Sequence, residues 1–586
     1  MAEKFQWPTV FGGLRDVKLT DIPREVSSGI TLAALIIPLN IGYAQIAGLP
    51  PVFGLYAGII PLVVFAIFTS SPHVVASPDA PIAAILGAVL IGFAPIGDPL
   101  RVQYALAISV MCGMMFFLFW FFRLAFLANF LSRAVLAGFI SGLGIEVLTN
   151  QIRKILGVAH TQVSGLDAIA EHIHNAIANS VNTTGFFVEL ITLFESIPHA
   201  NLYSFEIGLG TFVIVLLMKK YFPKIPAALI ALIFMTTIVS MLGLDKKGVS
   251  VLGSMPSGIP SLTIPSLPLF DYLHLLPGVM AVVGITLCEA LLLVRSCNRK
   301  HETKADGNQV LFAYGITSVV SGFTGSLISG PSASRTAAMD SAGSCSQLSS
   351  IVAAITVALV MVFFTKELAH LPSAALAGVV ASSVLNLIEV KEFRELWWMR
   401  RSEFWVAAVC LLSVLVFGPL RAVLIAFLLA TIDLLRRVSM PSTWVLQEAL
   451  DGSHFVPEER DHAPANSGII FYRFGAPLYF ANATFFEEEV EKLLIQACTP
   501  VKWFVLDMEA MVDIDTTGEE VLHHVLTSFR KKGVTVALTR PNQSTTNLLL
   551  HYNLNSLIDE SRIYPTNRHA ISAFRQETIK LSDIIG

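Results

Sequence analysis

Two short stretches decide the fold: residues 77–81 read Ser-Pro-Asp-Ala-Pro, and residues 329–335 read Ser-Gly-Pro-Ser-Ala-Ser-Arg. They open two apolar segments, 79–95 and 333–345, that are too short or too polar for ordinary membrane spans, which need roughly 20 apolar residues. Proline at a helix start leaves that end of the helix without backbone partners. The two stretches therefore predict two half-helices whose N-terminal ends are available to a ligand.

The two half-helices occupy corresponding positions in the two halves of the sequence. Fourteen apolar segments follow one another, and the two short ones are the third of each set of seven. Seven spans in each half would orient the halves oppositely, and short Gly/Pro-interrupted segments at corresponding positions indicate a transporter site near the bilayer midplane. The fourteen segments are 26–48, 51–69, 79–95, 103–122, 132–149, 204–221, 226–244, 273–294, 309–329, 333–345, 347–365, 371–389, 403–418 and 420–437.

The composition predicts a membrane domain followed by a soluble one. The 586-residue chain is 54% hydrophobic and 14% charged, whereas a typical soluble domain has about 25% charged residues. Residues 441–586 hold 31 of the 82 charged residues, and residues 1–440 hold the other 51. We therefore expect an N-terminal segment (1–25), a transmembrane domain (26–440) and a soluble domain (441–586). The net charge of −4 argues against a nucleic-acid partner.

The basic residues predict the orientation. With the N-terminus in the cytoplasm, most lysines and arginines near the spans fall in cytoplasmic loops, as the positive-inside rule requires. An even number of spans then places the soluble tail in the cytoplasm too. We therefore expect a multi-pass protein of the cell membrane with both termini in the cytoplasm. The inner loops hold Arg123, Lys219, Lys220, Lys224, Arg295, Arg299, Lys300, Lys304, Lys391, Arg394, Arg400, Arg401, Arg436 and Arg437; the outer loops hold Arg101, Arg153, Lys154, Lys246, Lys247, Lys366 and Arg421.

The two half-helices favour an anion. If their N-terminal ends face one another, free N–H groups and the positive ends of two helix dipoles converge on one point. Arg335 adds a fixed positive charge that can make paired hydrogen bonds. A charged residue among membrane spans is by default functional. The alternative is a kinked pair of structural helices from which Arg335 extends to the surface.

Longer stretches resemble a known family. Residues 21–56, DIPREVSSGITLAALIIPLNIGYAQIAGLPPVFGLY, resemble the signature of the sulfate permease (SulP) anion transporters. Residues 321–352, SGFTGSLISGPSASRTAAMDSAGSCSQLSSIV, together with 289–295 and 308–309, are similar to the block that covers that family's eighth to tenth helices. The matches follow the family's order over most of the chain.

The resemblance implies a specific architecture. It implies two inverted seven-helix repeats that form a core and a gate domain, an elevator-like movement of the core against the gate, and a homodimer. It also places the substrate between the third and tenth helices. Tyr43 would supply an aromatic wall from the first helix, although its pattern fits an interfacial tyrosine equally well. The substrate-binding residues implied are Tyr43, Ser77, Pro78, Asp79, Ala80, Ser332, Ala333, Ser334 and Arg335.

Glu289 is the candidate coupling residue. It lies in the apolar run GVMAVVGITLCEALLLV (278–294), where a carboxylate is costly unless it is paired or protonated. The resemblance associates an acidic residue here with coupling to a proton or to sodium. The family's sodium-dependent bicarbonate branch has a hydroxyl residue one turn later, where this chain has Leu293. This departure favours a proton, although other oxygen ligands leave Na⁺ open. The alternative is a permanent Glu289–Arg335 ion pair.

Asp79 departs from the family's pattern, which has an uncharged residue beside the substrate. A fixed negative charge there would repel an anion, so three explanations stand. Asp79 takes up a proton with the substrate and shares the coupling role, it caps the short helix, or the substrate carries a positive or hydrogen-donating group. We favour the first two explanations.

The soluble tail has the pattern of a small α/β domain, because β-like runs alternate with amphipathic helices. Residues 506–518, LDMEAMVDIDTTG, resemble the STAS domain shared with bacterial anti-sigma-factor antagonists, and 480–484, FANAT, match the family's run. In regulatory STAS proteins a serine after the equivalent aspartate is phosphorylated, and Thr516 after Asp515 occupies that position here. In transporters the domain is more often a folding and dimerisation module. The predicted strands lie in 468–480, 501–507 and 534–539, and the helices at 484–498, 516–531 and 543–552.

No pattern predicts a cofactor, a metal or an enzyme. The six cysteines are scattered, and no P-loop or nucleophile–base pair is present. Four histidines in the long outer connection 150–203 match no ligand spacing; they are His160, His172, His174 and His199.

The sequence therefore predicts a secondary transporter that carries a small anion with protons by an elevator mechanism. The anion is sulfate, bicarbonate or a dicarboxylate, because helix ends and an arginine recognise charge more than shape. The expected partners are this anion, membrane lipid and a second copy of the chain. The alternatives are a sodium-coupled or exchange-type anion transporter, a nucleobase carrier of the same fold, and an uncoupled channel or motor-like protein.

Overall fold

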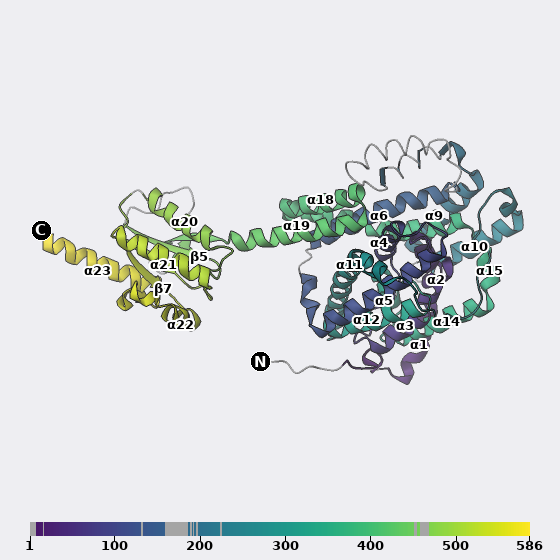
Figure 1. Cartoon of the computed structure of the whole chain (residues 1–586), viewed down its shortest axis with the longest axis horizontal. Coiled ribbons are helices and arrows are strands. Elements are labelled where there is room, and N and C mark those ends of the chain that lie inside the picture. The colour runs from purple at the N-terminus through teal and green to yellow at the C-terminus, as the bar shows by residue number, and fades with distance from the viewer. Residues whose placement is uncertain are drawn as a thin grey trace. The chain divides into compact units, whose positions relative to one another are not determined.

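The protein's structure is a computed structural model that divides the chain into two compact units, Met1–Ala430 and Thr431–Gly586. Figure 1 labels many of their helices and two of their strands, β5 and β7. The described residues are 8–585, except for 16, 130–132, 159–185, 188–189, 191–192, 195–196, 223–225, 450–453, 458–467 and 498.

One group of helices in the first unit contains both half-helices, α4 (Ala80–Ile91) and α13 (Ala333–Ser341). Within this group α1 packs on α14, α5 packs on α12, and α11 packs on α4 and α5. We call it the core group. Its other helices are α1 (Ile22–Ile46), α2 (Pro51–Ala57), α3 (Ile60–Phe68), α5 (Pro99–Phe121), α11 (Leu269–His301), α12 (Gly307–Phe323) and α14 (Leu348–Phe363).

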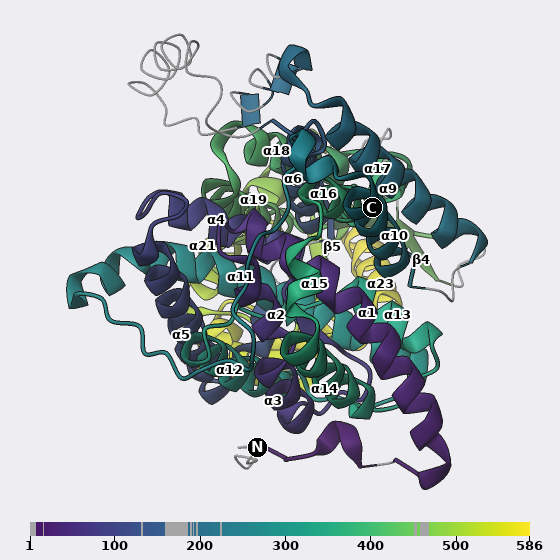
Figure 2. The same cartoon turned by 90° about the vertical axis from the view of Figure 1, so that its right-hand side faces the viewer.

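Most of the remaining helices of the first unit form a second group, which we call the gate group; the short α15 (Thr365–Ala369) instead follows α14 and packs on it. Helix α6 packs on α18 and α16, and α16 packs on α9. A Cβ atom on Gly138 of α6 would lie 2.1 Å from the carbonyl oxygen of Ala407 in α18, so the glycine allows the two backbones to touch. Figure 2 shows α3, α5, α12 and α14 below α6, α9, α17 and α18. The group comprises α6 (Arg133–Ile155), α9 (Leu202–Tyr221), α10 (Ala227–Leu242), α16 (Ser373–Val384), α17 (Val390–Met399), α18 (Arg401–Phe417) and the part of α19 (Pro419–Ser439) that precedes the unit boundary after Ala430.

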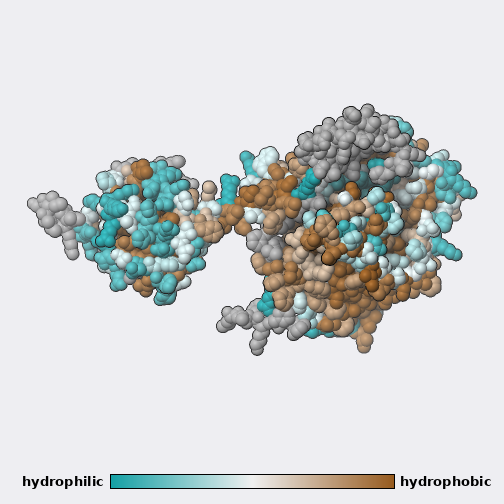
Figure 3. Space-filling model, viewed as in Figure 1, coloured by the Kyte–Doolittle hydropathy of each residue, from teal (hydrophilic) through white to brown (hydrophobic). Residues whose placement is uncertain are grey.

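The outer surface of this unit suits a lipid bilayer. Seven stretches of helix among the described residues are long and apolar enough to cross a membrane. Large apolar side chains such as Leu216 on α9 and Leu359 on α14 are exposed, and Figure 3 shows broad hydrophobic areas over the unit. Each of the fourteen predicted segments contains a helix. The predicted helical membrane domain is therefore confirmed, whereas the number of spans stays a prediction.

The second unit is built around a six-stranded sheet, which confirms the predicted α/β domain. The strand order is β4-β3-β5-β6-β7-β8. Strands β5 (Ile469–Phe474), β6 (Trp503–Asp507), β7 (Thr535–Thr539) and β8 (Ile563–Tyr564) are parallel, whereas β3 (Thr443–Glu448) and β4 (Phe455–Pro457) form an antiparallel edge. The helices are α20 (Ala483–Gln496), α21 (Thr516–Lys531), α22 (Gln543–His551) and α23 (Asn567–Ile585).

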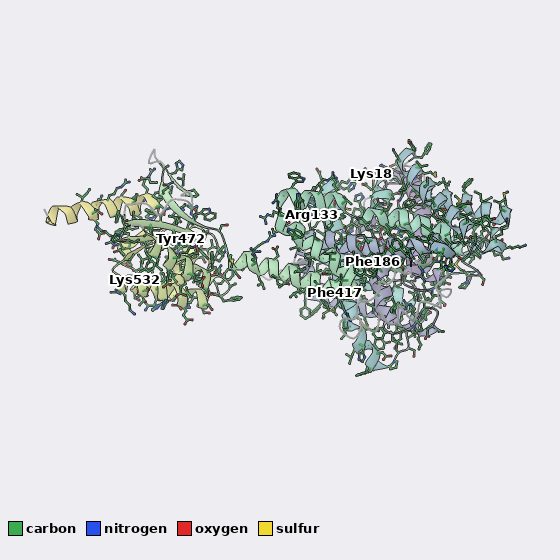
Figure 4. The ribbon with its side chains drawn as sticks, turned by 90° about the horizontal axis from the view of Figure 1, so that it is seen from above. Lys18, Arg133, Phe186, Phe417, Tyr472 and Lys532 are labelled. Atoms are coloured by element: carbon green, nitrogen blue, oxygen red, sulfur yellow. The ribbon has the colours of Figure 1, made fainter. Side chains whose placement is uncertain are left out.

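Both faces of this sheet are covered, as parallel strands require. Tyr472 and Phe504 pack toward Phe486 of α20 and Phe529 of α21 on one face. On the other face Trp503 packs against Phe574 of α23. Figure 4 shows Tyr472 among the strands. Of the two β-like runs that the sequence predicts within 468–480, only the first forms a strand of the sheet. In the second, Leu478 makes an isolated bridge to Ile514.

Asp507 ties together the carboxyl ends of three neighbouring strands. It is fully buried at the end of β6, where it accepts hydrogen bonds from Arg473 Nε (3.0 Å), Arg540 Nε (3.1 Å) and Asn567 Nδ2 (3.0 Å). Burial acts to raise the pKa of this carboxyl, but the bonds from Arg540 and Asn567 and the charges of both arginines outweigh it and hold the pKa below its ordinary value.

We expect Asp507→Asn to lower the free energy of unfolding of the second unit by about 2 kcal/mol, because two arginines lose a buried partner. A depressed carboxyl pKa stabilises the fold fully above the ordinary pKa of about 4, and that stabilisation is lost as the pH falls through the folded-state pKa. Hydrogen exchange of the β5–β7 amides in the full chain should be faster in the variant at neutral pH. The exposed Asp513→Asn is the matched control. Equally faster exchange in both variants, or no change in Asp507→Asn, would contradict the expectation.

Candidate functional site

The structure brings the two half-helices together through a pair of short strands. Strand β1 (Ala76–Ser77) precedes α4, β2 (Gly330–Pro331) precedes α13, and they pair antiparallel with Ala76 opposite Pro331. The backbone N–H of Ser332 also donates to the carbonyl of Val75 at 3.1 Å. The N-terminal ends of α4 and α13 therefore converge, as the proline-containing stretches predict. We call this convergence the joint.

Arg335 is buried at the joint, with 1% of its surface exposed. Its Nη1 donates to the carbonyl of Pro78 (2.6 Å) and to Ser332 Oγ (3.2 Å), and its Nη2 donates to Asn40 Oδ1 (2.8 Å). The guanidinium lies over the ring of Tyr43, 5.3 Å from its centre, at cation–π distance. Nε has no protein partner among the described residues. The alternative in which Arg335 extends to the surface is therefore wrong.

Asn40 is a site residue that the sequence patterns did not single out. Its Nδ2 donates to the carbonyl of Gly54 at 3.0 Å, which fixes the amide so that Oδ1 faces the joint. There Oδ1 accepts from Ser77 Oγ at 3.1 Å as well as from Arg335. A Cβ on Gly54 would lie 2.0 Å from the backbone oxygen of Asn40, so this approach needs glycine. The sequence feature that could have pointed to Asn40 is its position as a single polar amide in the apolar run LIIPLNIGYA (35–44).

Asp79 caps helix α4. Its Oδ1 accepts a hydrogen bond from the backbone N–H of Ala80 at 2.9 Å, which is one of the two explanations favoured by the sequence. No ion pair within 4 Å joins Asp79 to Arg335 in the described part of the chain, but the two groups interact electrostatically. Asp79 therefore faces the joint while its carboxylate is held by the helix end.

A cavity of about 1240 Å³ lies between the core group and the gate group. The exposed first residues of α13, Ala333 and Ser334, form part of its wall. Arg133, labelled in Figure 4 at the start of α6, lies on the gate side. The predicted residues that line the cavity are Tyr43, Asp79, Glu289, Ala333 and Ser334, whereas Ser77, Pro78, Ala80, Ser332 and Arg335 are buried behind them.

Glu289 of α11 faces the same cavity without a partner. No hydrogen bond or ion pair reaches its carboxylate from any residue that the structure describes, and the Glu289–Arg335 ion pair of the alternative interpretation is not formed. Its strongest electrostatic neighbours are two other carboxylates, Asp79 and Glu389. Leu293, one turn later, also lines the cavity and offers no oxygen ligand.

The two remaining sequence predictions lie away from this cavity. Thr516 is exposed at the first residue of α21, where the Asp515 carboxylate accepts from the N–H of Gly518 at 2.7 Å. Its phosphorylation stays a prediction. His199 ends a short 3₁₀ helix (Ile197–His199). The other histidines of that connection, His160, His172 and His174, lie outside the described residues.

Comparison with family models gives two matches. The model of the sulfate permease family matches residues 22–410, and that of the STAS domain matches residues 462–570. The first match covers the core group and most of the gate group, and the second covers the parallel part of the sheet.

Curated relatives match over almost the whole chain. A protein named as a probable sulfate transporter of Mycobacterium tuberculosis is 31% identical over 555 residues, which cover 94% of this chain and 95% of the relative. Sulfate transporter 3.2 of Arabidopsis thaliana is 27% identical and covers 95% of this chain and 87% of its own length.

Solved structures share the fold. The murine anion transporter Slc26a9, in its inward-facing state, superposes with a TM-score of 0.85 at 20% identity and covers 96% of this chain and 93% of its own. The transmembrane domain of the cyanobacterial bicarbonate transporter BicA has a TM-score of 0.58 at 20% identity, with 71% of this chain and 98% of its own covered. The joint, the core and gate groups and the sheet domain thus have one explanation: the chain belongs to the sulfate permease family of membrane anion transporters, with a STAS domain at its C-terminal end.

Proposed function

We propose that this protein is a secondary transporter that moves a small anion, with sulfate as the first candidate, together with protons. The observation that carries the proposal is that the joint around buried Arg335 and the unpaired carboxylate of Glu289 open onto one cavity. The names of the curated relatives support sulfate. Bicarbonate and dicarboxylates stay candidates, because helix N-termini and a guanidinium attract any small anion by its charge.

The joint supports an anion as the substrate. The first N–H groups of a helix have no partners within the helix, and Ser332 makes no side-chain cap at the start of α13. Two helix N-termini and one guanidinium then present positive potential to the cavity. Because Asp79 is held by Ala80, its charge partly offsets the dipole of α4 and leaves the end of α13 as the stronger anion site.

The carboxylates support a proton as the coupling ion. Glu289 has Asp79 and Glu389 as its electrostatic neighbours, so three carboxyl groups surround the space that an anion would enter. Like charges at short range favour protonation of one member. A proton on Glu289 would compensate the negative charge of the entering anion. Sodium is less well supported, because the Leu293 side chain has no oxygen that could bind a sodium ion.

The arrangement of the two groups supports an elevator mechanism. Pairing of β1 with β2 joins both half-helices into one body, so the core group can move as a unit with the substrate. The cavity separates this body from the gate group on one side. On the other side, a Cβ on Gly42 of α1 would lie 2.2 Å from Val380 Cγ2 of α16, so the glycine allows the two groups to pack closely without interlocking side chains at this point. A homodimer, a plasma or inner membrane location and cytoplasmic termini complete the proposal.

Uptake of labelled sulfate into proteoliposomes tests this function. Uptake should rise with an inward proton gradient, collapse when that gradient is abolished, and be inhibited by bicarbonate or dicarboxylates if these share the site. Uptake that ignores pH but follows sodium would contradict proton coupling. Voltage-dependent charge movement without substrate flux would contradict transport itself.

We expect Asn40→Ala to weaken anion binding about tenfold, equivalent to about 1.4 kcal/mol. The variant removes the acceptor that orients Arg335 and Ser77 while leaving the charge in place. Binding of labelled sulfate to purified protein measures the change. Ser109→Ala is the matched control, because Ser109 is equally buried in the core group but bonds within its own helix, to the carbonyl of Ala105. Equal affinities for both variants would show that Asn40 has no orienting role.

A further inference from the structure

Two histidines and an aspartate meet where three segments of the core group approach one another. His73 precedes β1, His301 is the last residue of α11, and Asp340 lies near the end of α13. The rings of His73 and His301 stack with their centres 3.9 Å apart, and His301 Nε2 lies 3.2 Å from Asp340 Oδ1. One possible ligand atom from each residue lies within 4.8 Å of the others. None of the three lines the anion cavity.

His73 provides an independent sign of a ligand. The residue is only 6% exposed, and its Nδ1 is buried without a hydrogen-bond partner among the described residues. Buried polar atoms are nearly always satisfied, so an unpaired ring nitrogen beside another imidazole and a carboxylate requires an explanation. A bound metal ion would give this nitrogen the partner that it lacks among the described residues.

The chemistry of the cluster fits a transition-metal ion. Two imidazoles and one carboxylate are typical zinc ligands, and three protein ligands leave a fourth position open. The Lys300 ammonium contacts the other oxygen of Asp340, in the way that ligating carboxylates are commonly held from behind. His301 and Asp340 are partly exposed, so they can rotate to close around an ion that enters from solvent. The Lys300 side chain is 67% exposed and can turn away when the ion's charge arrives.

We propose that His73, His301 and Asp340 form a binding site for a divalent transition-metal ion of the zinc type. The three ligands come from segments that lead to β1, to Glu289 and to Arg335, respectively. A bound ion therefore ties together the backbone that supports both halves of the joint. Metal binding stabilises the core group without contacting the transported anion.

Purified full-length protein with a histidine-free affinity tag tests the site. Co²⁺ should bind with one tightly held ion per chain, give visible absorption typical of mixed nitrogen and oxygen ligands, and be displaced by Zn²⁺. Zn²⁺ should also raise the thermal midpoint, because it binds the native state. His301→Gln and Asp340→Asn should each weaken Co²⁺ binding at least tenfold. These two variants are preferred because both residues are partly exposed and the fold tolerates their change better than that of buried His73.

Three control variants make the outcome decisive. His274→Gln removes an exposed histidine of α11. A triple variant of His160, His172 and His174 to Gln removes three of the four histidines of the connection 150–203. Both variants should keep the metal site. Lys300→Gln breaks the ion pair with Asp340 but retains all three proposed ligands, so Co²⁺ binding should persist or tighten. If the cluster had only a structural role, this variant would be less stable and Zn²⁺ would not change its thermal midpoint. Absence of Co²⁺ binding, binding unchanged in both ligand variants, or binding lost in the triple variant would overturn the proposal.

Discussion

Replacing Arg335 with alanine should abolish detectable anion uptake and weaken anion binding about 100-fold, which corresponds to about 2.7 kcal/mol. The guanidinium is the only fixed positive charge that the structure describes within the hydrogen-bonded joint, and it cross-links Pro78, Ser332 and Asn40. Its removal deletes the charge and takes one donor from each of three buried oxygens, of which Asn40 Oδ1 keeps the bond from Ser77. Binding of labelled sulfate separates this loss from a defect in movement.

Two further variants show whether charge or geometry is responsible. Arg335→Lys keeps the charge but cannot reach Pro78 and Asn40 together, so it should recover only part of the affinity. Arg394→Ala, which removes an exposed arginine of α17, should bind like the unmodified protein. All variants must elute as the unmodified protein does and unfold in a cooperative thermal transition, which shows that they are folded. Folded Arg335→Ala with unchanged anion affinity would show that the anion binds elsewhere, and retained binding of a neutral nucleobase by that variant would favour a nucleobase carrier.

Glu289→Gln should separate anion movement from the proton gradient. The amide resembles the protonated carboxyl, so internal anion should still exchange for external anion. Net accumulation driven by an inward proton gradient should fall at least tenfold, because no proton is carried at this position. Parallel uptake and counterflow assays in proteoliposomes measure both quantities.

Other carboxylates serve as controls for that experiment. Glu392→Gln removes a carboxylate of α17 that pairs with Arg133 at 2.9 Å and does not line the cavity, so it should retain accumulation. Asp79→Asn keeps a helix-capping side chain and should reduce accumulation less than Glu289→Gln. If Asp79→Asn alone abolished the response to the proton gradient, the coupling role would belong to Asp79 and the assignment to Glu289 would be wrong.

Features with a local cause were predictable from the sequence. Proline and glycine at 77–81 and 329–335 end or begin helices by their own backbone limits, so the half-helices followed from short stretches. The predicted helix 516–531 coincides with α21. The antiparallel edge strands β3 and β4 were not predicted, because strands at a sheet edge depend on the neighbour with which they pair.

Features that depend on distant contacts were not predictable in this way. Asn40 acts only because Arg335 lies beside it, 295 positions further along the chain. His73, His301 and Asp340 share no sequence spacing that a ligand motif could describe. Arg101, assigned to an outer loop, instead lies in the first turns of α5 and is buried, where it donates to the carbonyl oxygens of Ala94 (2.7 Å) and Ala47 (3.0 Å). Its charge compensates the ends of other helices, a use that a count of basic residues does not detect.

The antiparallel pairing of β1 with β2 also sets an order of events during synthesis. Pro78 and Arg335 are 257 residues apart, so the first half-helix is made and inserted long before its counterpart leaves the ribosome. Until then β1 has no partner strand, and an unpaired backbone is costly in a bilayer, where no water can satisfy it. Closure of so long a loop is slow relative to local helix formation. We therefore expect a nascent chain truncated before residue 330 to remain a substrate for membrane quality control, and a chain that contains both strands to escape it.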